Sequence, residues 1–118
     1  MSHVPVPRQW HVYVVDLAPR VGTKPGKQRP CLAIQPQEFA AAGLDSSVVL
    51  PITSRVAADA APLRVRLPAG TCELSVESDV MIDQVLAWSN DRFRKDLGPL
   101  PDALRIEVRN SLREFLDL

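Results

Sequence analysis

Short apolar runs, bounded by proline, glycine and polar residues, recur along most of the chain and predict a series of short β-strands. The predicted strands cover residues 10–17, 30–35, 47–53, 63–67, 72–78 and 80–88. The run at 30–35 is apolar at nearly every position, so we expect that strand to be buried on both faces or nearly so. Residues 63–67 alternate strictly, which places Arg64 and Arg66 together on the face opposite the apolar one.

A helical period replaces the strand pattern at the C-terminal end of the chain. Apolar residues recur there every four positions, at Leu104, Val108, Leu112 and Leu116, and Phe115 widens the stripe. This spacing predicts one long helix over residues 100–118, with its apolar stripe packed on the sheet. Two shorter helical segments are also expected. One covers residues 37–42 and ends at Gly43, and the other covers residues 90–97, capped by Ser89 and ended by Gly98.

Together these elements predict a mainly β protein with appended helices. The connections between the predicted strands are short, which favours antiparallel pairing. A sheet of five or six short strands is expected to curve strongly or to form a partly open barrel. Pro51 removes a hydrogen-bond donor from its strand, so it predicts a strand edge or a bulge there.

The 118 residues are enough for one domain, which we place at residues 10–118, after a proline-rich tail at residues 1–9 that we expect to be mobile. No apolar run approaches the length of about 18 residues that a membrane span needs, and the first residues do not form a signal peptide, so a cytoplasmic protein is expected. Cys31 and Cys72 lie in strand-like contexts, which favours buried, unreactive thiols over a disulfide or a metal site.

The charged residues balance in number but not in position. Fourteen basic and fourteen acidic side chains give a net charge of zero, which argues against a protein built to hold a polyanion. Residues 1–35, however, hold five basic side chains and one acidic one, for a net charge of +4, and the rest of the chain sums to −4. The glycines and prolines among the basic residues at 20–29 indicate a loop. That loop is either a solvated surface or a binding surface for an anion.

The chemistry of the chain centres on one arginine. The sequence has no glycine-rich phosphate loop, no Cys-x-x-Cys and no His-x-x-x-His, so nucleotide hydrolysis and zinc are not indicated and no metal or cofactor is expected. Pro30 restricts the backbone of Arg29, and a guanidinium placed in this way matches two phosphate oxygens. Thr53 and Ser54 bring hydroxyl groups to the end of a predicted strand, where turn formation is the simpler explanation for such a pair.

Four stretches, in this order and spacing, resemble the MazF/PemK family of toxin endoribonucleases from type II toxin–antitoxin systems. They are residues 14–17 with Pro19 and Gly22, the Arg29-Pro30 step, residues 49–54, and residues 78–85 followed by Arg92, Leu97-Gly98 and the terminal helix. The resemblance covers nearly the whole chain. It implies an SH3-like small curved barrel (MazF/CcdB-like) with a C-terminal helix, a homodimer, and a MazE-like antitoxin as partner protein.

The same resemblance implies cleavage of single-stranded RNA without a metal, to 2′,3′-cyclic phosphate and 5′-hydroxyl ends. It assigns catalysis to Arg29 and Thr53. The RNA-binding residues carried over, or placed next to these two in the sequence, are Lys24, Lys27, Gln28, Ser54 and Gln84. Compared with the family that it resembles, this chain has Lys24 where many relatives carry a glutamate, and Trp10-His11 where a Gly-Asp or Gly-Glu step usually precedes the first strand, so His11 becomes a speculative base.

Two questions remain open at the level of sequence. Trp10, Tyr13 and Trp88 are the aromatic candidates for stacking on bases, although core packing is favoured for Tyr13 and Trp88. The alternatives to an RNA endonuclease are a gyrase-poisoning toxin of the same fold and a small barrel that only binds protein or nucleic acid.

Overall fold

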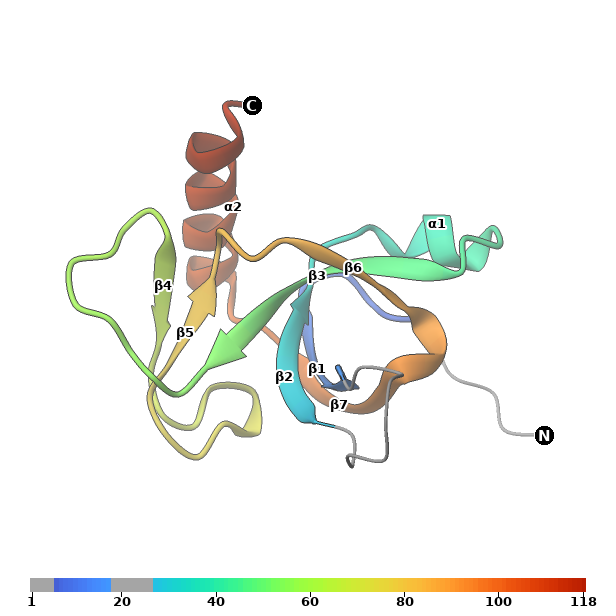
Figure 1. The fold of residues 1–118 in the computed structure, drawn as a ribbon, viewed down its shortest axis with the longest axis horizontal. Helices are drawn as coiled ribbons and strands as arrows, with labels where there is room; N and C mark the ends of the chain where they lie inside the picture. Colours follow the sequence, from blue (N-terminus) through green and yellow to red (C-terminus); the bar gives the residue numbers. More distant parts are fainter. Residues whose placement is uncertain (1–5, 18–26) are drawn as a thin grey trace.

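The computed structural model describes residues 6–17 and 27–118, which form one curved sheet with helices at its periphery (Figure 1). The strands are β1 (His11–Asp16), β2 (Gln28–Ala33), β3 (Ser46–Thr53), β4 (Arg64–Leu67), β5 (Ser78–Met81), β6 (Leu86–Ser89) and β7 (Phe93–Pro99). The helices are α1 (Gln37–Ala41) and α2 (Asp102–Leu116), and the 3₁₀ turns are η1 (Thr71–Glu73) and η2 (Asn90–Arg92).

The strands among these residues pair antiparallel in the order β4-β5-β3-β2-β1-β7. In addition, β6 pairs with the beginning of β3, whereas β5 pairs with its end. Figure 1 shows β3, β2, β1, β7 and β6 curving around a common centre, with α2 standing apart near β4 and β5. The sheet does not close into a full barrel. The prediction of a mainly β fold with a strongly curved sheet and a C-terminal helix is confirmed.

Two apolar clusters pack on opposite faces of the central strands. One fills the inside of the curve and consists of Tyr13, Val15, Cys31, Ala33, Val49 and Phe93. The other lies on the opposite face and joins β1, β2, β3, β4 and β5 to α2 through buried residues such as Val12, Leu32, Leu50, Ile52, Val65, Val80, Val108 and Leu112. The strands between the clusters are buried on both faces, as the apolar run at 30–35 predicts.

Helix α2 packs with the central part of its predicted stripe. Val108 and Leu112 are buried, and Leu104 packs against the same cluster. The end of the stripe does not reach the sheet, because the side chains of Phe115 and Leu116 are 42% and 46% exposed. The predicted helix is therefore confirmed, but its last apolar turn lies on the surface.

The predicted strand at 72–78 is wrong, because the backbone at its start adopts left-handed dihedral angles. Cys72 and Glu73 have φ angles of 47° and 59°, in the left-handed region that strands do not adopt. The strand predicted at 80–88 is two strands. β5 pairs with the end of β3 and β6 with its beginning, and residues 82–85 form the turn between them.

The predicted helix at 90–97 is also wrong. Only the η2 turn is helical, and β7 follows it because residues 93–99 pair with β1. Phe93 is buried edge-on against Tyr13, with ring centroids 5.4 Å apart. This tertiary contact overrides the local helical preference of the segment. Ser89 does not cap a helix, since its hydroxyl donates to the Asp91 carboxylate at 2.7 Å.

Pro51 does not lie at a sheet edge, since β3 is paired on both sides. It falls instead at an interruption, between the end of the β6 pairing at Val49 and the start of the β5 pairing at Ile52. Residues 1–5 of the predicted mobile tail lie outside the described residues. Residues 6–9 pack on the sheet, where the Arg8 amide donates to the Tyr13 hydroxyl at 2.8 Å.

No helix among the described residues has both the length and the apolar character required to cross a bilayer. No group of three or more histidine, cysteine, aspartate and glutamate side chains within residues 6–17 and 27–118 is arranged to hold a metal ion.

Cys31 is expected to resist alkylation in the folded protein. Its side chain is fully buried, and burial raises the pKa of its thiol to about 12, so the reactive thiolate is scarce at pH 8. Cys72 is half-buried and serves as the internal comparison. Mass spectrometry after iodoacetamide treatment should find label on Cys72 first and on Cys31 only after denaturation. Equal labelling rates in the native protein would contradict the burial of Cys31.

Candidate functional site

A groove opens where β2 and β3 stop pairing. The ladder between them runs from Ala33 and Val49 to Cys31 and Pro51. Beyond that point β2 continues against β1, whereas β3 continues against β5, so the two strand ends diverge (Figure 1). Neither Pro30 nor Pro51 has an N–H to donate, which weakens the pairing at the point where it ends. A hollow of about 370 Å³ lies between the diverging ends.

The groove is lined by residues from β2, from the end of β3 and from the segment before β5. The lining residues are Lys27, Gln28, Arg29, Pro30, Ile52, Thr53, Ser54, Leu74, Ser75, Val76 and Ser78. The structure thus brings together five residues that the sequence predicts for the site. It adds Leu74, Ser75, Val76 and Ser78, which the strand predicted at 72–78 did not place in a site.

Arg29 and Thr53 face the same side of the sheet. Cys31 and Pro51 are cross-strand partners, and Arg29 and Thr53 lie two positions from them, on β2 and on β3. Because side chains alternate along a strand, a step of two positions keeps each residue on the face of its neighbour. The guanidinium and the hydroxyl are therefore attached to the same face of two rigid strands.

The Thr53 hydroxyl is oriented by the chain that follows it. Its Oγ1 accepts a hydrogen bond from the Arg55 amide at 3.1 Å, and the residue is 9% exposed. A hydroxyl carries one proton in addition to its acceptor lone pairs. An oxygen that already accepts from Arg55 can therefore donate that proton to an acceptor in the groove.

The charged side chains that line the groove are Lys27 and Arg29, and no carboxylate appears among its lining residues within the described chain. A guanidinium offers a planar set of donors, whereas an ammonium acts as a compact point charge. With the hydroxyls of Thr53, Ser54 and Ser75 nearby, this set of groups is chemically suited to an anion with several oxygen atoms, such as a phosphodiester.

Two of the predicted site residues within the described chain do not line the groove. Gln84 is exposed in the turn between β5 and β6. His11 lies four residues along β1 from Val15, the partner of Arg29, which corresponds to about 13 Å of strand. The His11 ring nitrogen Nδ1 lies 3.0 Å from the Asp96 carboxylate. Lys24 falls outside the described residues.

The three aromatic side chains considered for stacking on bases pack against the protein core. Trp10 and Tyr13 are buried. Trp88 packs against the inner cluster, and its indole N–H donates to the Asp16 carbonyl at 2.7 Å. Core packing of Tyr13 and Trp88 is therefore confirmed.

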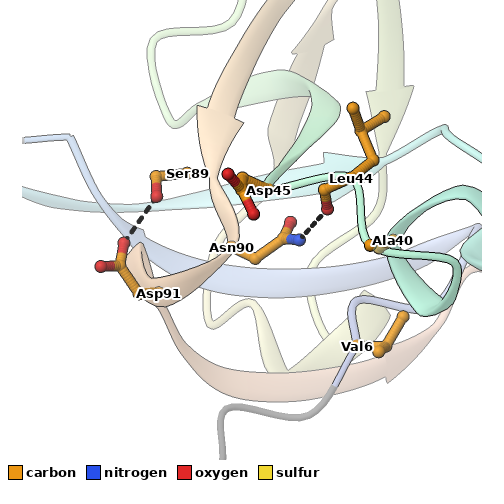
Figure 2. Close-up of a pocket in the computed structure, with 8 residues that line it drawn as sticks. Val6, Ala40, Leu44, Asp45, Ser89, Asn90 and Asp91 are labelled. Carbon is orange, nitrogen blue, oxygen red and sulfur yellow. Dashed lines mark hydrogen bonds between the residues drawn. The ribbon is translucent and has the colours of Figure 1, made fainter.

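A larger hollow of about 520 Å³ lies elsewhere, between α1 and the β6–η2 junction (Figure 2). Asn90 donates to the Leu44 carbonyl at 2.9 Å across it, and Asp45 and Asp91 supply its charged side chains. Two carboxylates without a lining cation do not suit a phosphate. The chemistry of the lining, rather than the volume, identifies the smaller groove as the candidate site.

The fold and groove define a small antiparallel-sheet protein that presents a fixed arginine and a threonine hydroxyl to a polyoxygen anion. The family described as PemK-like, MazF-like toxin of type II toxin-antitoxin system matches residues 8–116. The chain therefore belongs to the PemK-like, MazF-like toxins.

Individual relatives agree with this assignment. The chain is 36% identical over 107 residues to endoribonuclease MazF6 of Mycobacterium tuberculosis, which covers 91% of this chain and 94% of the relative. Among solved structures, it is similar to MazF from Deinococcus radiodurans, with a TM-score of 0.76, 26% identity, and coverage of 97% of this chain and 99% of that one. It is also similar to a chain of a MazE-MazF structure from the same organism, with a TM-score of 0.79, 26% identity and coverage of 97% and 99%.

Proposed function

We propose that this toxin is an endoribonuclease that cleaves single-stranded RNA in the β2–β3 groove without a metal ion. The observation that carries the proposal is the shared orientation of Arg29 and Thr53 in a cationic groove. Relatives at 36% identity are named endoribonucleases, which supports the same activity in this chain. The gyrase-poisoning and non-catalytic alternatives are not favoured by these relatives.

The chemistry uses a nucleophile that the RNA itself supplies. The ribose 2′-oxygen attacks the adjacent phosphorus and loses its proton to solvent water, a 2′-O–P bond forms, and the P–O5′ bond breaks. The departing 5′-oxygen gains a proton, so the products are a 2′,3′-cyclic phosphate and a 5′-hydroxyl. Negative charge builds on the phosphate oxygens in the transition state, where fixed donors stabilise it more than they stabilise the ground state.

Each groove residue has a role that fits its chemistry. Arg29 clamps the reacting phosphate, and its N–H groups can also donate to the leaving oxygen, since a guanidinium remains protonated at neutral pH. Thr53 donates its hydroxyl proton to a non-bridging oxygen. Lys27, Gln28 and Ser54 bind the flanking nucleotides, with the ammonium of Lys27 attracting the backbone. Contacts of Lys24 and Gln84 with RNA, and the role of His11 as a base, stay predictions.

The partners that we propose follow from the family. A homodimer acts on RNA in the cytoplasm, and a cognate MazE-like antitoxin restrains it. The similarity to a chain from a MazE-MazF structure supports the antitoxin as partner. An acidic antitoxin segment would complement the cations of the groove.

The defining experiment is incubation of the purified protein with a long single-stranded RNA in excess EDTA. We expect discrete fragments whose downstream pieces carry 5′-hydroxyl ends, since neither the nucleophile nor the proposed donors require a metal. End-group analysis with polynucleotide kinase identifies the hydroxyl directly. Intact RNA in EDTA, with cleavage restored by a divalent cation, would overturn the mechanism. Downstream fragments with 5′-phosphate ends would also overturn it.

A further inference from the structure

A cluster of charged residues lies beside Thr53, on the same face of the sheet. Asp79 is the cross-strand partner of Thr53 on one side and of Arg66 on the other. Cross-strand partners point to the same face, so Thr53, Asp79 and Arg66 form a row across β3, β5 and β4. Arg64 lies two positions from Arg66 and therefore joins the same face, as the alternation at 63–67 predicts.

Asp79 is a buried acid whose two oxygens are both occupied. The residue is fully buried, and its Oδ1 accepts from Arg66 Nε at 2.6 Å. Its Oδ2 accepts from Arg64 Nη1 at 3.2 Å and from the Ala57 amide at 2.8 Å. Burial raises the pKa of this carboxyl, but the Ala57 amide and the Arg66 guanidinium offset that effect, so the pKa lies below its usual value. Asp79 therefore carries its charge throughout the neutral range.

The charged cluster makes hydrogen bonds to the backbone that follows Thr53. Besides the Ala57 amide held by Asp79, the Ala57 carbonyl accepts from Arg66 Nη2 at 3.1 Å. The Arg55 carbonyl accepts from Arg64 Nη1 at 3.2 Å. The amide of the same Arg55 donates to the Thr53 hydroxyl. A continuous set of hydrogen bonds thus runs from the buried carboxylate, through residues 55–57, to the hydroxyl in the groove.

We propose that Asp79, together with Arg64 and Arg66, is a positioning residue that fixes residues 55–57 and, through them, the direction of the Thr53 hydroxyl. This inference rests on the proposed RNA cleavage. The two arginines neutralise the buried acid, so the chain after Thr53 is held in place without a negative charge being added to the groove lining. Asp79 is too buried to touch RNA, and its effect falls on the step in which Thr53 takes part.

Replacement of Asp79 tests this role. Asp79→Asn keeps the shape but removes the charge that holds both guanidinium groups. We expect kcat to fall by about tenfold to a hundredfold, as misplaced catalytic groups do, while KM for RNA stays within about twofold. Glu77→Gln is the matched control, because Glu77 pairs with the same Arg66 at 3.3 Å from an exposed position. Unchanged kcat in Asp79→Asn, or an equal loss in Glu77→Gln, would overturn the inference.

A double-mutant cycle separates positioning from general destabilisation. If Asp79 acts through Thr53, then Asp79→Asn causes no further loss of single-turnover rate in a Thr53→Val background. The same fractional loss in both backgrounds would show that Asp79 acts elsewhere. A structural defect alone would lower the rate in both.

Hydrogen exchange tests the inference without any activity. In Asp79→Asn the amides of Arg55 and Ala57 should exchange faster, whereas amides in α2 should not. If the wild type leaves RNA intact but this change is seen, the proposed function fails and the positioning contact stands. If Asp79→Asn does not fold, Arg64→Met decides, because it removes the Arg55 contact and leaves the Arg66 pair. Wild-type kcat and exchange in Arg64→Met would contradict the proposal.

Discussion

Replacing Arg29 with lysine is expected to lower the rate of RNA cleavage by about 10²- to 10³-fold, the usual cost of losing one transition-state donor. Lysine keeps the positive charge at this position but loses the planar set of donors. Binding of RNA should change much less than kcat, because Lys27 still lines the groove and the net charge is unchanged. Single-turnover cleavage of a short labelled RNA, with an independent binding measurement, separates the two effects.

Arg113→Lys is the matched control for Arg29→Lys. Arg113 is exposed in the last turn of α2, outside the groove, so the same substitution there should leave cleavage unchanged. Wild-type kcat in Arg29→Lys would remove Arg29 from catalysis and reduce its role to that of a charge.

Leu32→Ala is expected to lower the free energy of unfolding by about 2–5 kcal/mol. Leu32 is fully buried in β2, in the cluster that joins the sheet to α2, and its neighbours Leu50 and Ile52 are held by strand pairing. Rigid neighbours cannot collapse into the space that the substitution leaves. Such a loss is a large fraction of the 5–15 kcal/mol by which domains of this size are typically stable.

Urea unfolding followed by circular dichroism measures this loss. Leu118→Ala is the control, since Leu118 is 79% exposed and truncation there should change the unfolding free energy by no more than about 0.5 kcal/mol. A loss below about 1 kcal/mol in Leu32→Ala would show that the sheet relaxes around the cavity.

The local sequence pattern correctly predicts the strands that consist of one continuous run of strand-forming residues. Residues 10–17 and 47–53 are continuous runs of strand-forming residues, and both correspond to strands. The segment at 90–97 was mispredicted because its residues suit a helix, and only its pairing with β1, about 80 positions earlier, makes it a strand. Positive φ angles at Cys72 and Glu73 carry no sequence signal, since neither residue is a glycine.

The residues of the candidate site also divide into those that the local sequence identifies and those that depend on long-range strand pairing. The local sequence indicates a fixed guanidinium at the Arg29-Pro30 step and hydroxyl groups at the Thr53-Ser54 pair, and the resemblance to the family places them in one site. Asp79 was not predicted, although Arg64 and Arg66 were placed on a common face. Its partnership with them depends on the register between β4 and β5, which in turn depends on where β5 begins. The resemblance assigned Gln84 to RNA binding; the offset between β5 and β6 places it in an exposed turn outside the groove, where contact with RNA stays a prediction.

The pairing of β1 with β7 also bears on how the protein is made. Arg29 and Thr53 are synthesised in the first half of the chain, but β1, which supports β2, pairs with residues 93–99, and Thr53 pairs with Asp79. A ribosome must release most of the chain before either pairing forms. The nascent chain therefore carries the two proposed catalytic side chains well before it has the sheet that holds them, so the proposed site is incomplete while the chain is still being synthesised.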